Sequence, residues 1–383
     1  MNIWNIRKMS AGRKKINYYN VAADVAKYPK AWLYIAIGGR ARGKTYGALL
    51  DCKDHIADRD FIFIKRTMDD VDLLCSGTGN VNSTVRDVGV NVSPFAAINR
   101  DTGSDIRAYS IRKGMAGFWQ TEIGEDGKLQ PVGAPIGTIF ALNAVTKYKG
   151  FEMASAKKEQ WIIFDEFIPN LYDRVNVNEG KQLLDFYKTV SRDRVQRGLE
   201  EIKLICLANS TNIANPVFNE LELTDLVAEM VNTGTYKYYD PDRLIFIHLL
   251  EDDPAFIEIE ADTGLYKAMH DTQWGEMTYN NKFAYNDFSN VKRQALKNYR
   301  CVCGYKYHRT TVYIYYNEGK YFFTKSRSAA PVRIYDLQRE NEQKAFWRDW
   351  MMDLRIACIN DNVYFAQYSF YNLLANYKQL FRL

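Results

Sequence analysis

The feature that most constrains this chain is an apolar run that leads directly into the glycine-rich, cationic segment GGRARGKT at positions 38–45. The segment matches the pattern G-x-x-x-x-G-K-[ST]. AWLYIAI (31–37) before it has the composition of a buried strand, and KTYGALLDCKDHIA after it that of a helix. Glycines let backbone N–H groups surround a phosphate, and the helix N-terminus adds the positive end of its dipole. This context favours a phosphate-binding loop, or P-loop, over a plain glycine-rich turn.

Each position of the P-loop has an expected role in binding a nucleotide. Lys44 would reach the β- and γ-phosphates, and the Thr45 hydroxyl would bind Mg²⁺. ATP and Mg²⁺ are therefore the expected substrate and cofactor. The residues expected to surround the ATP phosphates are Gly38, Gly39, Arg40, Ala41, Arg42, Gly43, Lys44 and Thr45.

A second apolar run, QWIIFDEF (160–167), delivers two adjacent carboxylates. Alone, this pattern describes a strand end that meets solvent as well as it describes a catalytic pair. Combined with the P-loop, it predicts that Asp165 binds Mg²⁺ and that Glu166 orients and deprotonates the attacking water. A glutamate directly after the aspartate is typical of hydrolytic motor ATPases rather than of small-molecule kinases, in which an acceptor substrate replaces water.

A third apolar run, ICLANS (205–210), ends in two polar residues. Asn209 and Ser210 would sense the γ-phosphate from a neighbouring strand end. The alternative is a simple turn, because Asn and Ser both favour turns.

The segment SRDRVQR (191–197) follows a predicted helix and precedes that strand. Its arginines are explained either as a solvated helix end, which the helix dipole favours, or as a finger that enters a neighbouring subunit's ATP site. Arg192 is the preferred finger, with Arg194 and Arg197 as the other candidates.

The remaining pattern predicts an α/β fold with a mainly parallel central sheet and right-handed crossovers. Residues 71–135 form an insertion that contains a hairpin around GEDGK. After about residue 300, a hairpin that turns at 317–319 and helices at about 338–358 and 362–380 predict a small α+β domain. The strands of the central sheet are expected at 31–37, 60–66, 137–143, 160–167, 201–210 and 243–252, with a helix at 179–193.

The charge distribution indicates domain boundaries. Residues 251–290 hold 9 Asp and Glu against 2 Lys and Arg, whereas residues 291–383 hold 16 Lys and Arg against 7 Asp and Glu. We therefore expect an ATPase domain at 1–252, an acidic linker at 253–290 and a basic domain at 291–383. A basic, aromatic-rich domain suggests a polyanion partner, and an ordinary solvated surface is the alternative. No apolar run is long enough to cross a bilayer.

The basic domain lacks the pattern of a nuclease. Two-metal cleavage needs several carboxylates that converge on one point. The predicted hairpin strands offer none, and Asp349 and Asp353 share one face of a helix. We expect this domain to contact phosphates through basic residues interleaved with tyrosines rather than to cut DNA.

Five segments together resemble one known family. GGRARGKT, IIFDEFIP, TVSRDR, ICLANSTNIANPVF and WGEMTYNNKF, in this order, resemble the DNA-encapsidation ATPases of small protein-primed tailed phages, which are terminase-like packaging motors. The resemblance is close over 31–66 and 160–220 and thin in the basic domain. It implies a P-loop ATPase fold of the additional-strand catalytic-glutamate type, followed by a degenerate RNase H-like nuclease domain.

The resemblance also implies a function. It implies an ATP-driven translocase that packages double-stranded DNA into a viral procapsid, in the cytoplasm of the infected host cell. The motor would be a homo-oligomeric ring, usually of five subunits, on the portal of the procapsid, with an RNA component as a further candidate partner and no membrane. By resemblance, Arg40 is the family's P-loop arginine and Arg192 its trans-acting arginine.

Two alternatives stay open from the sequence. The chain could be another ring-forming nucleic-acid motor, such as a conjugation pump or a helicase. It could instead be a nucleotide-dependent switch or assembly scaffold that hydrolyses ATP poorly.

The sequence also suggests where DNA would be held. Lys147 and Lys149 lie in NAVTKYKGF (143–151), a polar loop after a predicted strand. A loop at a strand end could face the channel of a ring, so we expect these lysines to contact the DNA backbone.

Overall fold

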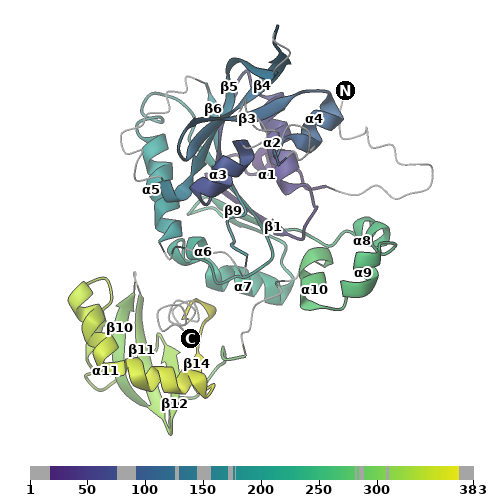
Figure 1. Cartoon of the computed structure of the whole chain (residues 1–383). Helices are drawn as coiled ribbons and strands as arrows, with labels where there is room; N and C mark the ends of the chain where they lie inside the picture. The colour runs from purple at the N-terminus through teal and green to yellow at the C-terminus, as the bar shows by residue number, and fades with distance from the viewer. Residues whose placement is uncertain are drawn as a thin grey trace. The chain divides into compact units, whose positions relative to one another are not determined.

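The computed structural model describes residues 18–75, 92–125, 129–144, 157–170, 176, 178–280, 283, 289–307 and 310–370. The chain packs as two compact units, shown in Figure 1. The first comprises Met1–Asn212 and Thr233–Ala284, and the second comprises Ile213–Asn232 and Tyr285–Leu383. Within the described residues, no helix has both the length and the apolar character needed to span a membrane.

The first unit is built on a nine-stranded sheet in the order β3-β4-β5-β2-β6-β7-β1-β9-β8. The six strands from β5 to β9 in this order are parallel to their neighbours, and the strands at both edges are antiparallel. The mainly parallel sheet is as predicted. The strands are β1 (Leu33–Gly38), β2 (Arg59–Lys65), β3 (Ile106–Arg112), β4 (Met115–Ile123), β5 (Leu129–Ala141), β6 (Glu159–Asp165), β7 (Lys203–Asn209), β8 (Lys237–Asp240) and β9 (Ile245–Leu249).

The central strands are continuous apolar runs because both faces of a parallel sheet are covered by helices. All six residues of β1 are buried, and β6 and β7 each expose only their ends in part. The register pairs Gly38 with Asn209 and Asp165 with Leu207. The carboxyl ends of β1, β7 and β6 therefore meet at one edge of the sheet, with β7 between the other two.

The helices of the first unit connect these strands. The helix after the P-loop, α2, contacts β2 and β7, and α5 leads from β6 back toward the start of β7. The helices are α1 (Val21–Lys27), α2 (Lys44–Asp54), α3 (Met68–Cys75), α4 (Ala96–Thr102), α5 (Glu179–Ser191), α8 (Pro254–Glu260), α9 (Gly264–Met269) and α10 (Gln273–Tyr279).

The expected insertion at 71–135 enlarges the sheet rather than forming a separate body. Its hairpin is as predicted, with Ile123 of β4 paired to Leu129 of β5, and this ribbon projects beyond the neighbouring strands in Figure 1. Aromatic rings hold the insertion to the parallel sheet, because Phe118 stacks on Phe61 with the ring centroids 6.1 Å apart. Phe95, before α4, meets Phe118 edge to face at 4.9 Å.

The second unit contains a separate five-stranded sheet in the order β13-β10-β11-β12-β14. The predicted hairpin turns where Asn317 pairs with Lys320, and Glu318 and Gly319 take the positive φ angles that such a turn requires. The elements of this unit are β10 (Arg300–Tyr307), β11 (Thr310–Asn317), β12 (Lys320–Thr324), β13 (Ile334–Asp336), β14 (Val363–Phe365), α6 (Pro216–Glu220), α7 (Thr224–Thr233) and α11 (Glu340–Ile359).

Two helices were expected in this unit, and the prediction of the second is wrong at its first residues. The helix at about 338–358 is observed as α11, but β14 occupies positions 363–365, inside the helix expected at 362–380. Val363 and Phe365 are buried, and β14 pairs in parallel with β12. Tertiary pairing with an open sheet edge therefore overrides the local helical pattern. Positions 371–383 lie outside the described residues.

The boundaries of the two packed units differ from the boundaries that the charge distribution indicates. The acidic residues up to Ala284 pack with the first unit, whereas Ile213–Asn232, which lies between β7 and β8 in the chain, packs with the second. Asp225 of α7 accepts hydrogen bonds from the backbone N–H and the hydroxyl of Ser369, at 2.9 and 2.6 Å. Composition does not register such long-range contacts.

Candidate active site

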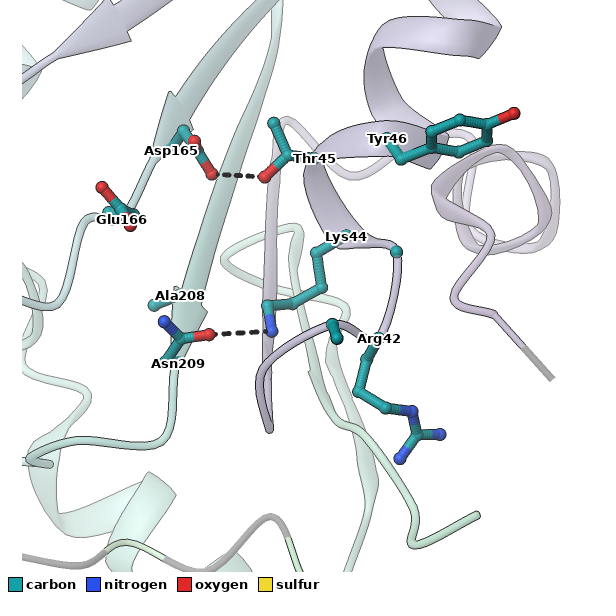
Figure 2. Close-up of a pocket in the computed structure, with 10 residues that line it drawn as sticks. Arg42, Lys44, Thr45, Tyr46, Asp165, Glu166, Ala208 and Asn209 are labelled. Carbon is teal, nitrogen blue, oxygen red and sulfur yellow. Dashed lines mark hydrogen bonds between the residues drawn. The ribbon is translucent and has the colours of Figure 1, made fainter. Parts of the chain in front are cut away.

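The carboxyl ends of the central strands form a pocket with the P-loop, shown in Figure 2. The P-loop follows β1, the acidic pair follows β6, and Asn209 ends β7. The parallel register therefore assembles three segments that the sequence had identified separately. The residues that line the pocket are Ala41, Arg42, Gly43, Lys44, Thr45, Tyr46, Asp165, Glu166, Ala208 and Asn209.

The conformation of the P-loop requires glycine at two positions. Gly43 precedes α2 with φ +77°, a left-handed conformation that other residues adopt only at a cost. Gly38 lies against Leu250, and a Cβ added at Gly38 would stand 2.7 Å from the Leu250 Cβ. Ala41 also has a positive φ, +56°, so the loop turns sharply twice before α2 begins.

Lys44 is buried and extends under the loop. Its ammonium donates to the backbone oxygens of Gly38 and Gly39, at 3.0 and 2.6 Å, and to Asn209 Oδ1 at 3.2 Å. Burial lowers the pKa of Lys44 to about 7, because the charged form is poorly solvated there; Asp165 counteracts this lowering. A phosphate in the pocket would supply the negative charge that favours the ammonium.

Thr45 and Asp165 meet across the pocket. The Thr45 hydroxyl donates to Asp165 Oδ1 at 2.7 Å, and Figure 2 shows the two side chains pointing toward each other. A hydroxyl and a carboxylate are the oxygen ligands that Mg²⁺ prefers beside substrate phosphates. These two residues therefore fit the expected Mg²⁺ site, in which the ion would take the place of their mutual hydrogen bond.

Glu166 is presented by an unusual backbone conformation. Its φ is +57°, and its side chain is 54% exposed at the mouth of the pocket. Arg66 stabilises this turn by donating to the backbone oxygens of Glu166 and Phe167, at 2.9 and 3.1 Å. Arg66 is itself held by the buried Glu179 at the start of α5. Strained backbone that is fixed from several sides is common where a catalytic side chain must be aimed.

Lys65 is a site residue that the sequence argument missed. It ends β2, beside β6, and its ammonium lies 3.1 Å from Asp165 Oδ2 and 3.4 Å from Glu166 Oε2. Burial alone would lower the pKa of Lys65, but the charges of the two carboxylates outweigh this and raise it. Lys65 is therefore a cation that both members of the acidic pair share. The sequence feature that could have identified it is the pair Lys65–Arg66 at the end of an apolar run in β2. This pair corresponds to Asp165–Glu166 at the end of β6, the neighbouring strand.

The other expected site residues differ in their exposure and in the groups that they contact. Arg40 is exposed, whereas Arg42 is buried and directs its guanidinium to the Glu251 carbonyl. Ser210, expected beside Asn209, is fully buried with its hydroxyl 3.5 Å from the Met277 carbonyl oxygen of α10. Lys147 and Lys149 lie outside the described residues.

The three candidate arginines differ in their surroundings. Arg194 is buried and donates to the backbone oxygens of Glu200, Lys157 and Lys158, at 2.7–2.8 Å. Arg197 is exposed but paired with Asp193 at 3.3 Å. Arg192 is exposed and has φ +26°. Its backbone N–H donates to the Lys188 carbonyl oxygen at 3.1 Å, whereas its side chain has no hydrogen-bond or ion-pair partner among the described residues.

Comparison with known proteins identifies the family. A family model described as the podovirus DNA encapsidation protein (Gp16) matches residues 145–369, which is more than half of the chain. The chain belongs to this family. It is a viral genome packaging ATPase, as its resemblance had implied. Among curated proteins, none matches the sequence.

Two solved structures share the fold of this packaging ATPase. One is the Phi-28 gp11 DNA packaging motor, with a TM-score of 0.59 and 16% identity over 96% of this chain and 98% of that one. The other is the bacteriophage Phi-29 genome packaging motor assembly, with a TM-score of 0.56 and 18% identity over 95% of this chain and 98% of that one. The two similarities extend over both units.

We expect Glu166→Gln to separate ATP binding from ATP hydrolysis. The substitution keeps the size of the side chain and leaves Lys44, Thr45 and Asp165 in place, but an amide cannot accept a proton from water. ATP affinity should stay within a few-fold of wild type, and turnover should fall by roughly 10²–10⁴-fold. Equilibrium binding of a fluorescent ATP analogue and a phosphate-release assay measure the two quantities. Near-normal phosphate release would contradict the role of Glu166.

We expect Lys65→Met to impair turnover through the acidic pair. The substitution keeps a side chain of similar length but removes the cation that holds Asp165 and Glu166. Turnover should fall by roughly 10–10²-fold because the carboxylates lose their fixed orientation, and Lys65→Arg should retain part of it. Lys158→Met is the matched control, since Lys158 is exposed and distant from the pocket. Turnover of Lys65→Met within twofold of this control would exclude a positioning role.

Proposed function

We propose that this packaging ATPase hydrolyses ATP at the pocket of Figure 2 and uses the energy to translocate double-stranded DNA into a procapsid. The observation that supports this most directly is the convergence of Lys44, the Thr45–Asp165 pair and Glu166 at one edge of the sheet. Membership of the encapsidation family favours packaging over a conjugation pump or a helicase. The names of the Phi-28 and Phi-29 motors agree with it.

The chemistry follows from the positions of the side chains. Lys44 and the N–H groups of the P-loop bind the phosphates and stabilise the charge that develops on the γ-phosphoryl oxygens. Glu166, exposed at the mouth, accepts a proton from the attacking water. Lys65 and Arg66 fix its orientation, and Asn209 links the end of β7 to Lys44. Mg²⁺, held by Thr45 and Asp165, would neutralise phosphate charge when bound.

The order of the strands supports the finer fold assignment. One strand, β7, lies between the P-loop strand β1 and the acidic strand β6. This is the arrangement expected of an additional-strand ATPase with a catalytic glutamate. The acidic pair is therefore carried by a strand that is not adjacent to the P-loop strand.

We assign the second unit as a degenerate, nuclease-like domain without cleavage activity. Asp349 on α11 is engaged by Arg333, Arg348 and the Tyr335 hydroxyl, at 3.2, 2.8 and 2.8 Å. A carboxylate that is neutralised in this way is a poor metal ligand. The remaining role for the unit is the binding of nucleic acid or of the portal through its basic residues.

The geometry supports a trans role for Arg192 over a role in its own pocket. Arg194, two residues on, binds the backbone just before β6 and β7 begin, so this turn lies at the amino edge of the sheet. The pocket lies at the carboxyl edge. A seven-residue strand separates the edges by about 20 Å, at roughly 3.3 Å per residue, which exceeds the reach of an arginine. A guanidinium from Arg192 would therefore act on the ATP of an adjacent subunit.

A head-to-tail contact in which each subunit completes its neighbour's site gives a closed ring or an open filament, and the family resemblance favours the ring. We propose a homo-oligomer of five subunits on the portal of the procapsid, with double-stranded DNA in its channel and an RNA component as a further candidate partner. Hydrolysis would then depend on ring closure, because the charge that Lys44 and Mg²⁺ leave uncompensated is neutralised only across the interface.

Sustained, DNA-stimulated ATP turnover is the test that distinguishes a motor from a nucleotide switch. We expect the full chain, assembled on procapsids, to hydrolyse many ATP molecules per subunit and to accelerate when double-stranded DNA is added. The Glu166→Gln variant under identical conditions is the control for contaminating ATPases. A single turnover followed by a stable ADP complex, unaffected by DNA, would instead support the switch.

The trans role of Arg192 is tested by mixing two inactive variants. Arg192→Ala subunits keep an intact pocket but lack the finger, whereas Glu166→Gln subunits lack the base but keep the finger. Each alone should be nearly inactive, since a missing finger costs roughly 10³–10⁵-fold in related phosphoryl transfer. Mixed rings should partly recover ATPase activity, because some Arg192→Ala pockets receive an arginine from a Glu166→Gln neighbour.

Arg197→Ala is the matched control, because Arg197 lies in the same turn but is paired with Asp193. It should retain most of the activity. If mixed rings form, as shown by co-purification of differently tagged subunits, and stay as inactive as their components, Arg192 does not act in trans.

A further inference from the structure

The P-loop contacts an element that the proposed hydrolysis does not use. The Arg42 residue is 5% exposed, and its guanidinium points away from Asp165 and Glu166 in Figure 2. Its Nη1 donates to the Glu251 carbonyl oxygen at 3.1 Å, and its Nη2 lies 4.0 Å from Asp253 Oδ2. A residue inside the phosphate-binding loop is thus attached to the segment that follows β9.

Asp253 links this contact to a helix. Its carboxylate is the N-cap of α8 and accepts hydrogen bonds from the N–H groups of Ala255 and Phe256, at 3.0 and 3.4 Å. Such a cap stabilises the first helical turn. The Phe256 ring lies 5.7 Å from the Arg42 guanidinium, so the arginine packs on the same turn that Asp253 caps.

The Arg42 guanidinium is only partly satisfied in this position. It is one of the few buried cations of the unit, yet its Nε has no hydrogen-bond partner among the described residues. An arginine has five N–H donors, and a buried donor without a partner is costly. Phosphate oxygens in the adjoining pocket, which Arg42 also lines, would therefore compete with Asp253 for the guanidinium.

The charge of the segment that contains α8, α9 and α10 indicates which side a bound nucleotide would favour in this competition. Residues 251–279 hold 8 Asp and Glu against a single Lys. A bound triphosphate would repel these carboxylates and attract the P-loop arginine at the same time. Both effects weaken the attraction between Arg42 and Asp253, and ADP, with less charge, weakens it less.

We propose that Arg42 is a positioning residue that ties the P-loop to the first turn of α8, and that ATP in the pocket loosens this tie. This inference rests on the proposed function, because it requires ATP at the P-loop. It makes the helical segment α8–α10, which precedes the second unit in the chain, responsive to the nucleotide.

Hydrogen exchange on the full chain tests the inference. The Glu166→Gln background keeps ATP intact during the measurement. With ATP and Mg²⁺, amides of the P-loop should become protected, whereas amides of residues 255–260 should exchange about 3- to 10-fold faster, and ADP should have a smaller effect. Asp253→Asn, which retains a capping oxygen but removes the charge, should abolish the response of α8 to ATP while the P-loop is still protected.

Lys237→Gln is the matched control. Lys237, on β8, forms an ion pair with Glu251 at 3.4 Å. This substitution therefore removes a cation that binds the same acidic segment, without changing a contact of the P-loop. The response of α8 should persist. Arg42→Lys, which keeps the charge but loses the forked geometry, should weaken the response and provides a second variant if Asp253→Asn folds poorly.

The outcomes separate the two proposals. If ATP protects the P-loop but leaves the exchange of α8 unchanged or slows it, the inference is overturned. It is also overturned if the response is as large in Asp253→Asn and Arg42→Lys as in the background variant. If ATP does not protect the P-loop at all, the proposed ATP site is overturned and the inference with it.

Discussion

The candidate active site depends on one constraint, the in-register parallel pairing of β1, β7 and β6. Because Gly38 pairs with Asn209 and Asp165 with Leu207, the P-loop and the acidic pair emerge from the same edge of the sheet. A shift of β7 by one residue would turn Asn209 to the other face and break its hydrogen bond to Lys44. The buried apolar residues of these strands fix that register. The hydrophobic core of the first unit and the geometry of its pocket are therefore set by the same contacts.

Around this edge, the polar and charged side chains bind other groups of the protein. Lys44 is held by P-loop carbonyls and Asn209, Thr45 by Asp165, and Glu166 by Lys65. Buried charges are tolerated in proteins only with such partners. The contacts of Lys44, Thr45 and Asp165 involve groups that ATP or Mg²⁺ would bind, so binding would exchange one set of partners for another instead of desolvating isolated charges. Preorganised polar groups of this kind stabilise a transition state efficiently because they need little rearrangement.

The two edges of the sheet have different roles in the proposed motor. The carboxyl edge holds a subunit's own ATP, whereas the amino edge holds the turn in which Arg194 is pinned and Arg192 is exposed. The buried Arg194 holds this turn to the starts of β6 and β7, which gives Arg192 a defined position although its side chain has no partner among the described residues. A chain with its nucleotide at one edge and its arginine at the other is suited to head-to-tail assembly, because each pocket meets the opposite edge of the next subunit.

The sequence by itself determined the local chemistry of this protein. Glycine, lysine and threonine spacing defined the P-loop, and apolar runs that end in Asp165–Glu166 and in Asn209 predicted strands with polar tips. These signals are local, since spacing along the chain fixes them. The tertiary structure decided what spacing cannot encode. It brought Lys65 to the acidic pair, and it placed the Arg42 guanidinium against the first turn of α8. It buried Ser210 and Arg194 while exposing Arg192, and it formed β14 at the start of an expected helix. Each of these outcomes depends on contacts between residues that are distant in sequence. The packing of neighbouring elements, and not the identity of the residue alone, determines which partner a charged side chain reaches.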